Sequence, residues 1–109
     1  MIIVTEQPID PEGMYARLDT SGGGSAIYHY AVVRGRTGDT RTTGIHFERG
    51  GDMEAELEEI ARDLAQGFAL DDVVLARRLG SVRPGDIISL VAVCAPRSAN
   101  AIEGCHQGV

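Results

Sequence analysis

The chain has 109 residues, the size of one domain with one hydrophobic core, and we expect residues 1–109 to fold as a single domain. Hydrophobic residues make up 43% and charged residues 24% of the sequence, which is typical of a folded globular protein and excludes a disordered chain. The net charge of −6 argues against general nucleic-acid binding, because such binding needs basic patches that neutralise phosphates.

The sequence shows no signal for secretion or membrane insertion. Residues 1–10 lack a basic region followed by an apolar run of signal-peptide length. No segment approaches the roughly 18 consecutive apolar residues that a transmembrane helix needs. Two cysteines, Cys94 and Cys105, are too few for a disulfide framework, and Cys94 lies in an apolar run where a thiol usually packs as a small core residue. We therefore expect a cytoplasmic protein without membrane contact.

Strand, helix and loop signals follow one another in the first third of the chain. Residues 2–4 form a short apolar strand candidate, and Asp10 before Pro11 predicts the start of a short helix. The glycine-rich loop at residues 20–25 lacks the GxxxxGK[ST] and GxGxxG patterns of phosphate-binding loops. Residues 25–33 (SAIYHYAVV) are apolar on both faces, which predicts a central strand covered on both sides.

A turn, a strand and a helix are expected next. The Gly-Asp pair at residues 38–39 indicates a turn, and a second strand is expected near residues 42–48. A helix is predicted over residues 52–66, with Asp52 as its N-cap and Gly67 as its end. Its apolar stripe recurs at spacings of three and four residues and consists of Met53, Leu57, Ile60, Leu64 and Phe68.

The last third of the chain contains two strands around a tight turn. Residues 72–79 (DVVLARRL) begin apolar and end basic, and residues 87–95 (IISLVAVCA) are almost entirely apolar, as in a strand buried on both faces. The segment 83–86 (RPGD) predicts a turn, because Pro presets φ at its second position and Gly permits a positive φ at its third. Ser98 is a possible cap for a final helix, and Arg97 places a cation at the corner between strand and helix.

Five short motifs occur in order between Gly24 and Cys105. They are AVVR at residues 31–34, Gly-Asp at 38–39, RRLG at 77–80, Pro-Gly-Asp at 84–86 and CAPR at 94–97. In this order and spacing they resemble the large, catalytic subunit of molybdopterin synthase. That family has five motifs in the same order. They are a Gly-x-Val-Arg-like segment, a Gly-Asp loop, a strand ending His-Arg-x-Gly, a Pro-Gly-Asp turn and a helix that starts with Ser-Ala-His-Arg.

The resemblance implies an α+β fold of the α/β-hammerhead type, with a mixed or antiparallel sheet and two to three helices, assembled as a homodimer. It implies a partner, a small ubiquitin-like subunit whose C-terminal thiocarboxylate provides sulfur. Two sulfurs move onto cyclic pyranopterin monophosphate, which becomes the dithiolene of molybdopterin. Arg34 and Arg97 match pocket arginines of the family, so we expect them to bind the pterin phosphate, whose oxygens suit the planar, permanently charged guanidinium.

The sequence departs from the family at the groups that do chemistry. Pro96 stands where the family has the histidine before the pocket arginine, and Arg77 replaces the histidine of His-Arg-x-Gly. All ten basic residues are arginine, and the chain ends before the family's lysine-bearing segment, so no residue is assigned as catalytic. Lysine can act as nucleophile or base, whereas arginine keeps its proton. We therefore expect a degenerate active site with impaired sulfur transfer, and whether the chain is an enzyme stays open.

Three functions remain open on these residues. The chain can be a divergent synthase subunit whose missing groups come from a partner, a non-catalytic paralogue that binds an anionic small molecule or a ubiquitin-like tail, or a structural dimeric scaffold. A metal enzyme is disfavoured, because the available ligands show no CxxC or HxxxH spacing. These ligands are His29, His46, Cys94, Cys105 and His106. We expect neither a metal nor a cofactor.

Overall fold

The computed structural model describes residues 1–37, 40–41 and 44–109, and the side chains outside residues 36–43. The turn predicted at residues 38–39 lies outside this part, as do the first positions of the strand predicted near residues 42–48. Within the described part the helices are α1 (Pro11–Tyr15), α2 (Met53–Phe68) and α3 (Ser98–Gly108). The strands are β1 (Ile2–Thr5), β2 (Ser25–Val32), β3 (Arg36–Thr37), β4 (Thr40–Arg41), β5 (Ile45–Phe47), β6 (Asp72–Arg78), β7 (Gly80–Val82) and β8 (Ile87–Ala95).

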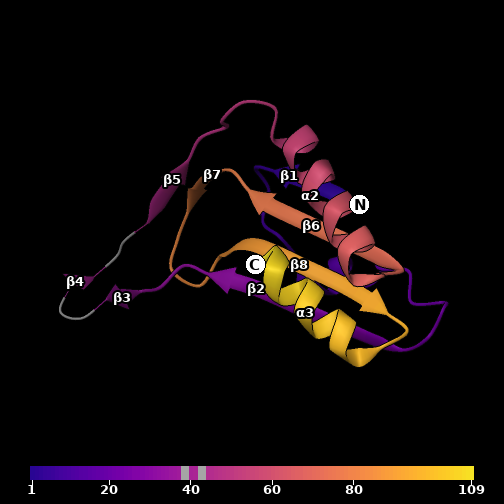
Figure 1. Cartoon of the computed structure of the whole chain (residues 1–109). Coiled ribbons are helices and arrows are strands. Elements are labelled where there is room, and N and C mark those ends of the chain that lie inside the picture. The colour runs from indigo at the N-terminus through magenta and orange to yellow at the C-terminus, as the bar shows by residue number, and fades with distance from the viewer. Residues whose placement is uncertain (38–39, 42–43) are drawn as a thin grey trace.

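Four strands form the main sheet in the order β1-β6-β8-β2. β1 runs parallel to β6, whereas β6–β8 and β8–β2 are antiparallel, so the sheet is mixed as expected. Two short antiparallel pairs, β5–β7 and β3–β4, extend beyond one end of this sheet (Figure 1). Together with the three helices, this arrangement confirms the predicted α+β class. No helix in the described residues has both the length and the apolar character to cross a membrane.

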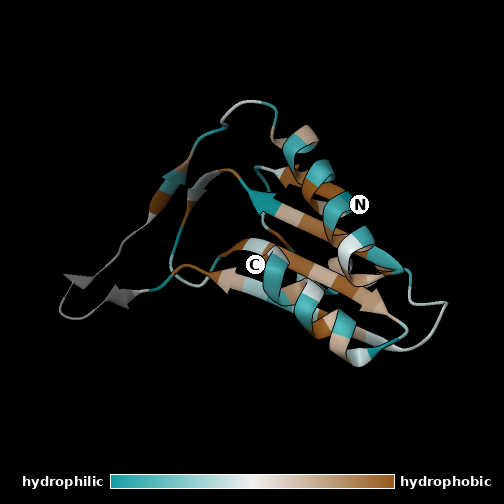
Figure 2. Ribbon diagram, in the orientation of Figure 1, coloured by the Kyte–Doolittle hydropathy of each residue, from teal (hydrophilic) through white to brown (hydrophobic). Residues whose placement is uncertain are grey.

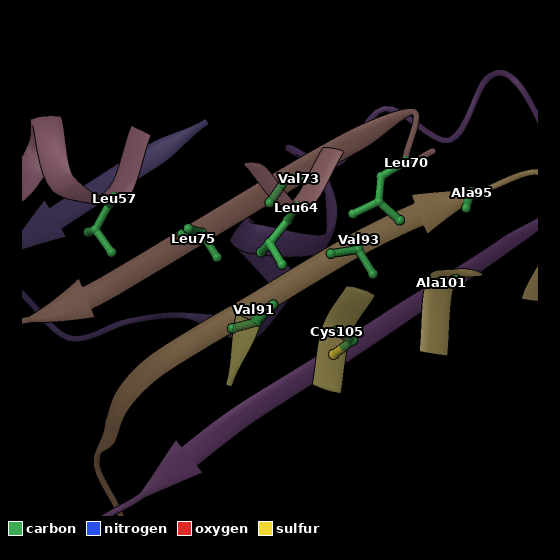
Figure 3. Close-up of a cluster of buried hydrophobic side chains, with 10 residues drawn as sticks. All are labelled: Leu57, Leu64, Leu70, Val73, Leu75, Val91, Val93, Ala95, Ala101 and Cys105. Atoms are coloured by element: carbon green, nitrogen blue, oxygen red, sulfur yellow. The ribbon is translucent and has the colours of Figure 1, made fainter. Parts of the chain in front are cut away.

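Helices α2 and α3 cover one face of the main sheet (Figure 1). Leu57 and Leu64 of α2 and Cys105 of α3 point toward Val91 and the neighbouring strand residues in a buried cluster (Figure 3). Hydrophobic residues concentrate along β6 and β8, while the outward turns of α2 are largely hydrophilic (Figure 2). Burial of these apolar side chains is the main term that holds the helices to the sheet.

The opposite face of the sheet packs against the segment around α1. Ile9 and Leu18 flank α1 and contact Val74, Leu90 and the apolar strand residues next to them. Because successive strand residues point to opposite faces, β8 contributes to both clusters. This confirms the prediction that residues 87–95 form a strand buried on both faces.

Residues 25–33 were predicted to be a central strand, and this is wrong. β2 is an edge strand of the main sheet, with β8 as its neighbour on one side only among the described strands. Its side chains are accordingly only half-covered: Tyr30 is 43% and Val32 41% exposed. Apolar residues on both faces predicted burial, but strand order is decided by pairing with distant β8, which local composition does not encode.

The start of α2 is as predicted, but its end is not. Asp52 is the N-cap, and its side chain accepts a hydrogen bond from Ala55 N at 3.1 Å. The expected stop at Gly67 is wrong, because the helix continues to Phe68, which packs against the core, and Ala69 forms the cap in the left-handed region with φ 51°. Tertiary packing of Phe68 therefore carries the helix past the glycine.

The predicted apolar stripe of α2 holds at most positions. Leu57 and Leu64 are buried, and Phe68 packs against them from a partly buried position. Ile60 is the exception, being 42% exposed, and Ala61 occupies the core-facing side instead. The helix therefore sits on the sheet through a narrower stripe than the spacing alone predicts.

The predicted tight turn is confirmed. Asp86 N donates to Arg83 O at 3.0 Å, and Gly85, at the third position, has φ 93°. The same turn continues into β8 and closes onto the residue after β2, because Gly85 N donates to Val33 O at 3.0 Å. The turn thus fixes the end of the main sheet from which Arg34 emerges.

Candidate functional site

Arg97 stands at the corner between β8 and α3, where the sequence places it. It is the N-cap residue of α3, with φ −107° and ψ 129°, and its carbonyl accepts a hydrogen bond from Ala101 N at 3.1 Å. Its side chain is exposed and forms no ion pair with a residue whose side chain is described. The guanidinium is therefore accessible to a ligand at this corner.

The N-terminus of α3 has no side-chain cap. The prediction that Ser98 caps this helix is wrong, because Ser98 is its first residue and its hydroxyl lies 2.6 Å from the Ser25 hydroxyl of β2. Arg97 provides no cap hydrogen bond either. Among the described side chains, none accepts a hydrogen bond from the first amides of α3, which lie at the positive end of the helix dipole. Together with the Arg97 guanidinium, they form an environment that suits an anion.

Arg34 lies just beyond the last residue of β2. The preceding residue, Val33, is buried, and its backbone N donates to Asp86 O of the tight turn at 3.0 Å. The side chain of Arg34 is exposed and makes no ion pair within the described part of the chain. The turn therefore holds the backbone at Arg34 while its guanidinium faces solvent.

A single chain does not bring Arg34 and Arg97 together. β2 begins beside the end of β8, next to Arg97, and ends beside the start of β8, next to Arg34. The eight residues of β2 span about 25 Å at the usual rise per strand residue. Two arginines at this separation cannot contact one phosphate, so a shared anion site would need two copies of the chain.

The two residues that depart from the family motifs have different surroundings. Pro96 is exposed and lies against the glycine-rich loop, where a Cβ on Gly24 would come within 2.7 Å of Pro96 Cα. Arg77 is half-buried near the end of β6, and burial lowers the pKa of its guanidinium from the ordinary value. It nevertheless keeps its proton near neutral pH, as arginine does in proteins. A permanent cation therefore occupies the position of a family histidine.

Neither cysteine provides a reactive thiolate. Cys94 and Cys105 are free and buried, and they belong to the core clusters on opposite faces of the sheet. Burial is the main cause that raises the pKa of each thiol above its ordinary value. Because the thiolate is the nucleophilic form, both side chains are protonated and unreactive near neutral pH. Cys94 is the small core residue that the sequence predicts.

Two adjoining hollows near β5 and β7 were not predicted. One, of about 390 Å³, includes Glu6 and His46, and the other, of about 280 Å³, lies between Phe47, Met53 and Arg77 and is called the Arg77 hollow below. Both depend on the pairing of β5 with β7, strands about 35 positions apart, which no local pattern signals. Among the described residues, no group of three or more His, Cys, Asp or Glu is arranged to hold a metal ion.

The chain matches a known protein family over almost its whole length. The family model described as MoaE protein matches residues 4–109, which is almost the whole chain. The chain belongs to the MoaE family. The resemblance to the large subunit of molybdopterin synthase is thereby confirmed.

Two curated relatives of this MoaE family member are named molybdopterin synthase catalytic subunit. The protein from Caulobacter vibrioides is 29% identical over 108 residues, covering 96% of this chain and 71% of the relative. The protein from a Nostoc species is 25% identical over 108 residues, covering 97% of this chain and 66% of the relative. The chain thus spans roughly two thirds of the length of these relatives.

Solved structures share the fold. Molybdopterin cofactor biosynthesis protein E from Burkholderia multivorans has a TM-score of 0.83 at 24% identity, covering 99% of this chain and 72% of that one. Molybdopterin synthase from Staphylococcus aureus has a TM-score of 0.86 at 21% identity, covering 98% and 77%. A complex of subunits 1 and 2 of molybdopterin-converting factor from Helicobacter pylori has a TM-score of 0.77 at 16% identity, covering 97% and 73%. These likenesses confirm the predicted MoaE-type α+β fold.

Proposed function

We propose that this MoaE family member acts in molybdenum cofactor biosynthesis as a divergent large subunit of molybdopterin synthase that binds the phosphate of cyclic pyranopterin monophosphate. The observation that carries the proposal is Arg97 at the uncapped N-terminus of α3, in a chain whose family match includes that corner. Arginine holds phosphate oxygens through a planar fork of donors, and free helix amides add further donors. Arg34 is the second proposed phosphate ligand.

The proposed binding unit is a homodimer. Because Arg34 and Arg97 lie at opposite ends of β2, a site that uses both takes one arginine from each copy. The edge position of β2 supports this arrangement, since an edge strand has backbone groups available for pairing or covering. The exposed side chains of Tyr30 and Val32 on this strand add apolar surface that association would bury.

The proposed partner is a small ubiquitin-like subunit that carries a C-terminal thiocarboxylate. The Helicobacter pylori structure of similar fold is a complex of two subunits, which supports a two-subunit assembly. In the proposed reaction, two such tails each donate one sulfur to the pterin substrate, which gains the dithiolene. The role of the large subunit in this reaction is to hold the substrate phosphate and the tail close together.

The residues of this chain favour binding over catalysis. Pro96 brings no titratable group to the position of the family histidine, and Arg77 does not release its proton near neutral pH. Both thiols are buried. We infer that these residues bind substrate and partner. Pro96 also favours a second candidate, a non-catalytic paralogue that binds an anionic small molecule or a ubiquitin-like tail.

The test combines a binding measurement with an activity assay. Calorimetry with cyclic pyranopterin monophosphate should detect binding that Arg97→Ala weakens at least tenfold, whereas Arg62→Ala on the exposed side of α2 should leave it unchanged. Dithiolene formation is then assayed with thiocarboxylated small subunit, with and without a catalytically competent large subunit. Product from the chain and small subunit alone would contradict the inferred impairment. No pterin-phosphate binding, together with no product in any mixture, would contradict the role as a divergent synthase subunit and leave the non-catalytic alternatives.

A further inference from the structure

The Arg77 hollow is separate from the two arginines proposed to bind phosphate. Neither Arg34 nor Arg97 lines it, and its lining residues come from β5, the first turn of α2, the end of β6 and the start of β8. Its volume of about 280 Å³ is close to the lower end of small-molecule sites, about 300 Å³. Several side chains around it are only partly buried, so solvent and small solutes can reach it.

Apolar side chains form most of its wall. Phe47 comes from β5, Met53 is the first residue of α2, and Ile88 belongs to β8. Each of the three is partly buried, so a portion of its apolar surface faces the hollow and water. A ligand with an apolar body would remove this surface from water, which is favourable in proportion to the area covered.

A β-bulge brings Ile88 into the hollow. On the two paired strands, Ala31 lies opposite Ser89 and Val32 lies opposite Ile87, so Ile88 is the extra residue. The bulge interrupts the alternation of side chains, and Ile88 and Ser89 therefore both line the hollow, while Ile87 packs against the cluster on the other face. Bulges often re-aim side chains next to functional sites.

Arg77 brings a cation with unused donors. Alternation along β6 places it on the face of Val73 and Leu75, which α2 and α3 cover. Within the described residues its guanidinium makes one long hydrogen bond, from Nη1 to Ala76 O at 3.4 Å, and no ion pair. The adjacent Arg78 differs, because it donates to two carbonyls of the following residues at 3.1 and 3.2 Å. Arg77 therefore has donors available to a ligand.

The remaining polar groups restrict the charge of that ligand. Ser89 is the cross-strand neighbour of Arg77 and adds a hydroxyl, whereas Glu48 adds a carboxylate that pairs with neither arginine. A phosphate dianion would be repelled by Glu48 and would exceed the net charge of the lining, where two guanidinium groups (Arg77 and Arg78) face one carboxylate. A monoanion matches this excess of one positive charge, and an apolar body matches the walls.

We propose that the Arg77 hollow binds a small organic carboxylate with an apolar body. The carboxylate pairs with the Arg77 guanidinium, whose planar fork fits two carboxylate oxygens, and Ser89 donates to the same group. The body of the ligand lies against Phe47, Met53 and Ile88. Partial burial of Arg77 strengthens the ion pair relative to one at a fully exposed site.

Benzoate is a suitable probe, with neutral benzamide as its matched control. Titration of benzoate into nitrogen-15-labelled protein should shift the amide signals of Met53, Arg77 and Ser89, and Arg77→Gln should weaken binding at least tenfold. Benzamide should bind at least tenfold more weakly than benzoate. Glu48→Gln should tighten benzoate binding severalfold, because it removes the opposing charge. Arg62→Gln, on the exposed side of α2, should have no effect.

A contact measurement on the wild-type protein tests the proposal even if the Arg77→Gln variant fails to fold. Nuclear Overhauser contacts should connect the benzoate ring protons with the Met53 methyl group. Benzamide binding as tightly as benzoate, or a folded Arg77→Gln variant with full affinity, would overturn the proposal. Benzoate-induced amide shifts confined to Arg34 or Arg97 would also overturn it. The same holds if protein saturated with benzoate shows no Overhauser contact between the benzoate ring and the Met53 methyl group.

Discussion

Arg34 and Arg97 lie at opposite ends of the antiparallel pair β2–β8, separated by about 25 Å along the eight residues of β2. Both guanidinium groups are exposed, and neither forms an ion pair within the described part of the chain. The tight turn holds the chain at one arginine, and the start of α3 positions the other. Because of this separation, dimers that combine two different arginine variants can test whether the proposed anion site uses one arginine from each copy of the chain.

Arg34→Ala and Arg97→Ala should each abolish high-affinity binding of pterin phosphate when tested alone. A mixed dimer of the two variants has one site that lacks both arginines and one site that retains both. When equal amounts of the two variants are unfolded, mixed and refolded, half of the random dimers are mixed, and each mixed dimer has one intact site out of two. Binding should therefore return at close to one quarter of the wild-type number of sites. Calorimetric stoichiometry measures this number. No recovery in dimers verified as mixed would show that the two arginines do not share a site.

Gly104 allows α3 to pack closely on the core. An added Cβ would lie 3.0 Å from each of the two Leu70 methyl carbons, an overpacking cost of about 1–3 kcal/mol. The gain in helix propensity, about 0.5–1 kcal/mol, offsets only part of this cost, so Gly104→Ala should lower the free energy of unfolding by about 0.5–2 kcal/mol. Gly67, near the end of α2, has no heavy atom within 4 Å of the same added Cβ. Gly67→Ala should therefore raise the free energy of unfolding by about 0.5–1 kcal/mol through helix propensity. Urea unfolding of both variants checks the opposite signs, and equal effects would contradict the packing account.

Ala69 ends α2 in the left-handed region, with φ 51° and ψ 50°. That conformation costs a residue with a Cβ about 1–2 kcal/mol, whereas glycine adopts it freely. Ala69→Gly should therefore raise the free energy of unfolding by about 0.5–1 kcal/mol, despite the greater freedom of glycine in the unfolded chain. Ala55→Gly, inside the same helix, should lower it by about 1 kcal/mol. A destabilising Ala69→Gly in thermal or urea unfolding would refute this explanation of the helix end.

Arg49 and Glu54 join the loop after β5 to the first turn of α2. Two hydrogen bonds connect them, at 2.5 and 2.9 Å, and they hold the pKa of the Glu54 carboxyl below its ordinary value. The stabilisation from this pair is present above the unfolded pKa of Glu54 and is lost as the pH falls through the lowered folded pKa. Carbon-13 NMR titration should find a higher midpoint for Glu54 in Arg49→Gln. An unchanged midpoint would mean that the pair does not persist in solution.

Local features were predictable because they depend on neighbouring residues. Asp10 and Asp52 cap the helices that follow them, and Gly85 takes the positive φ that the Pro-Gly turn requires. The sequence-based predictions were wrong at positions where a contact with a distant residue competes with a local preference. Ser98 bonds to Ser25, 73 positions away, and so does not cap α3. Phe68 reaches the core, and so the helix does not end at Gly67.

The candidate site was predictable only in part, for the same reason. The motif order identified the family and pointed to Arg34 and Arg97, since motifs are read along the chain. It did not indicate that α3 lacks a side-chain cap beside Arg97, because that depends on the hydroxyl contact across to β2. Nor did it reveal the hollow at Arg77, whose walls come from four separate elements.

The sequence by itself determined the α+β class, the caps and turn, the buried character of β8 and the membership of the MoaE family. Each of these rests on side-chain chemistry within a few positions, or on motif order along the chain. Only the tertiary structure decided that β2 lies at the sheet edge, that Arg34 and Arg97 are separated by its length, and that Arg77 faces Phe47 and Met53. These depend on which distant strands pair, and pairing is selected by the packing of the whole core rather than by any one segment.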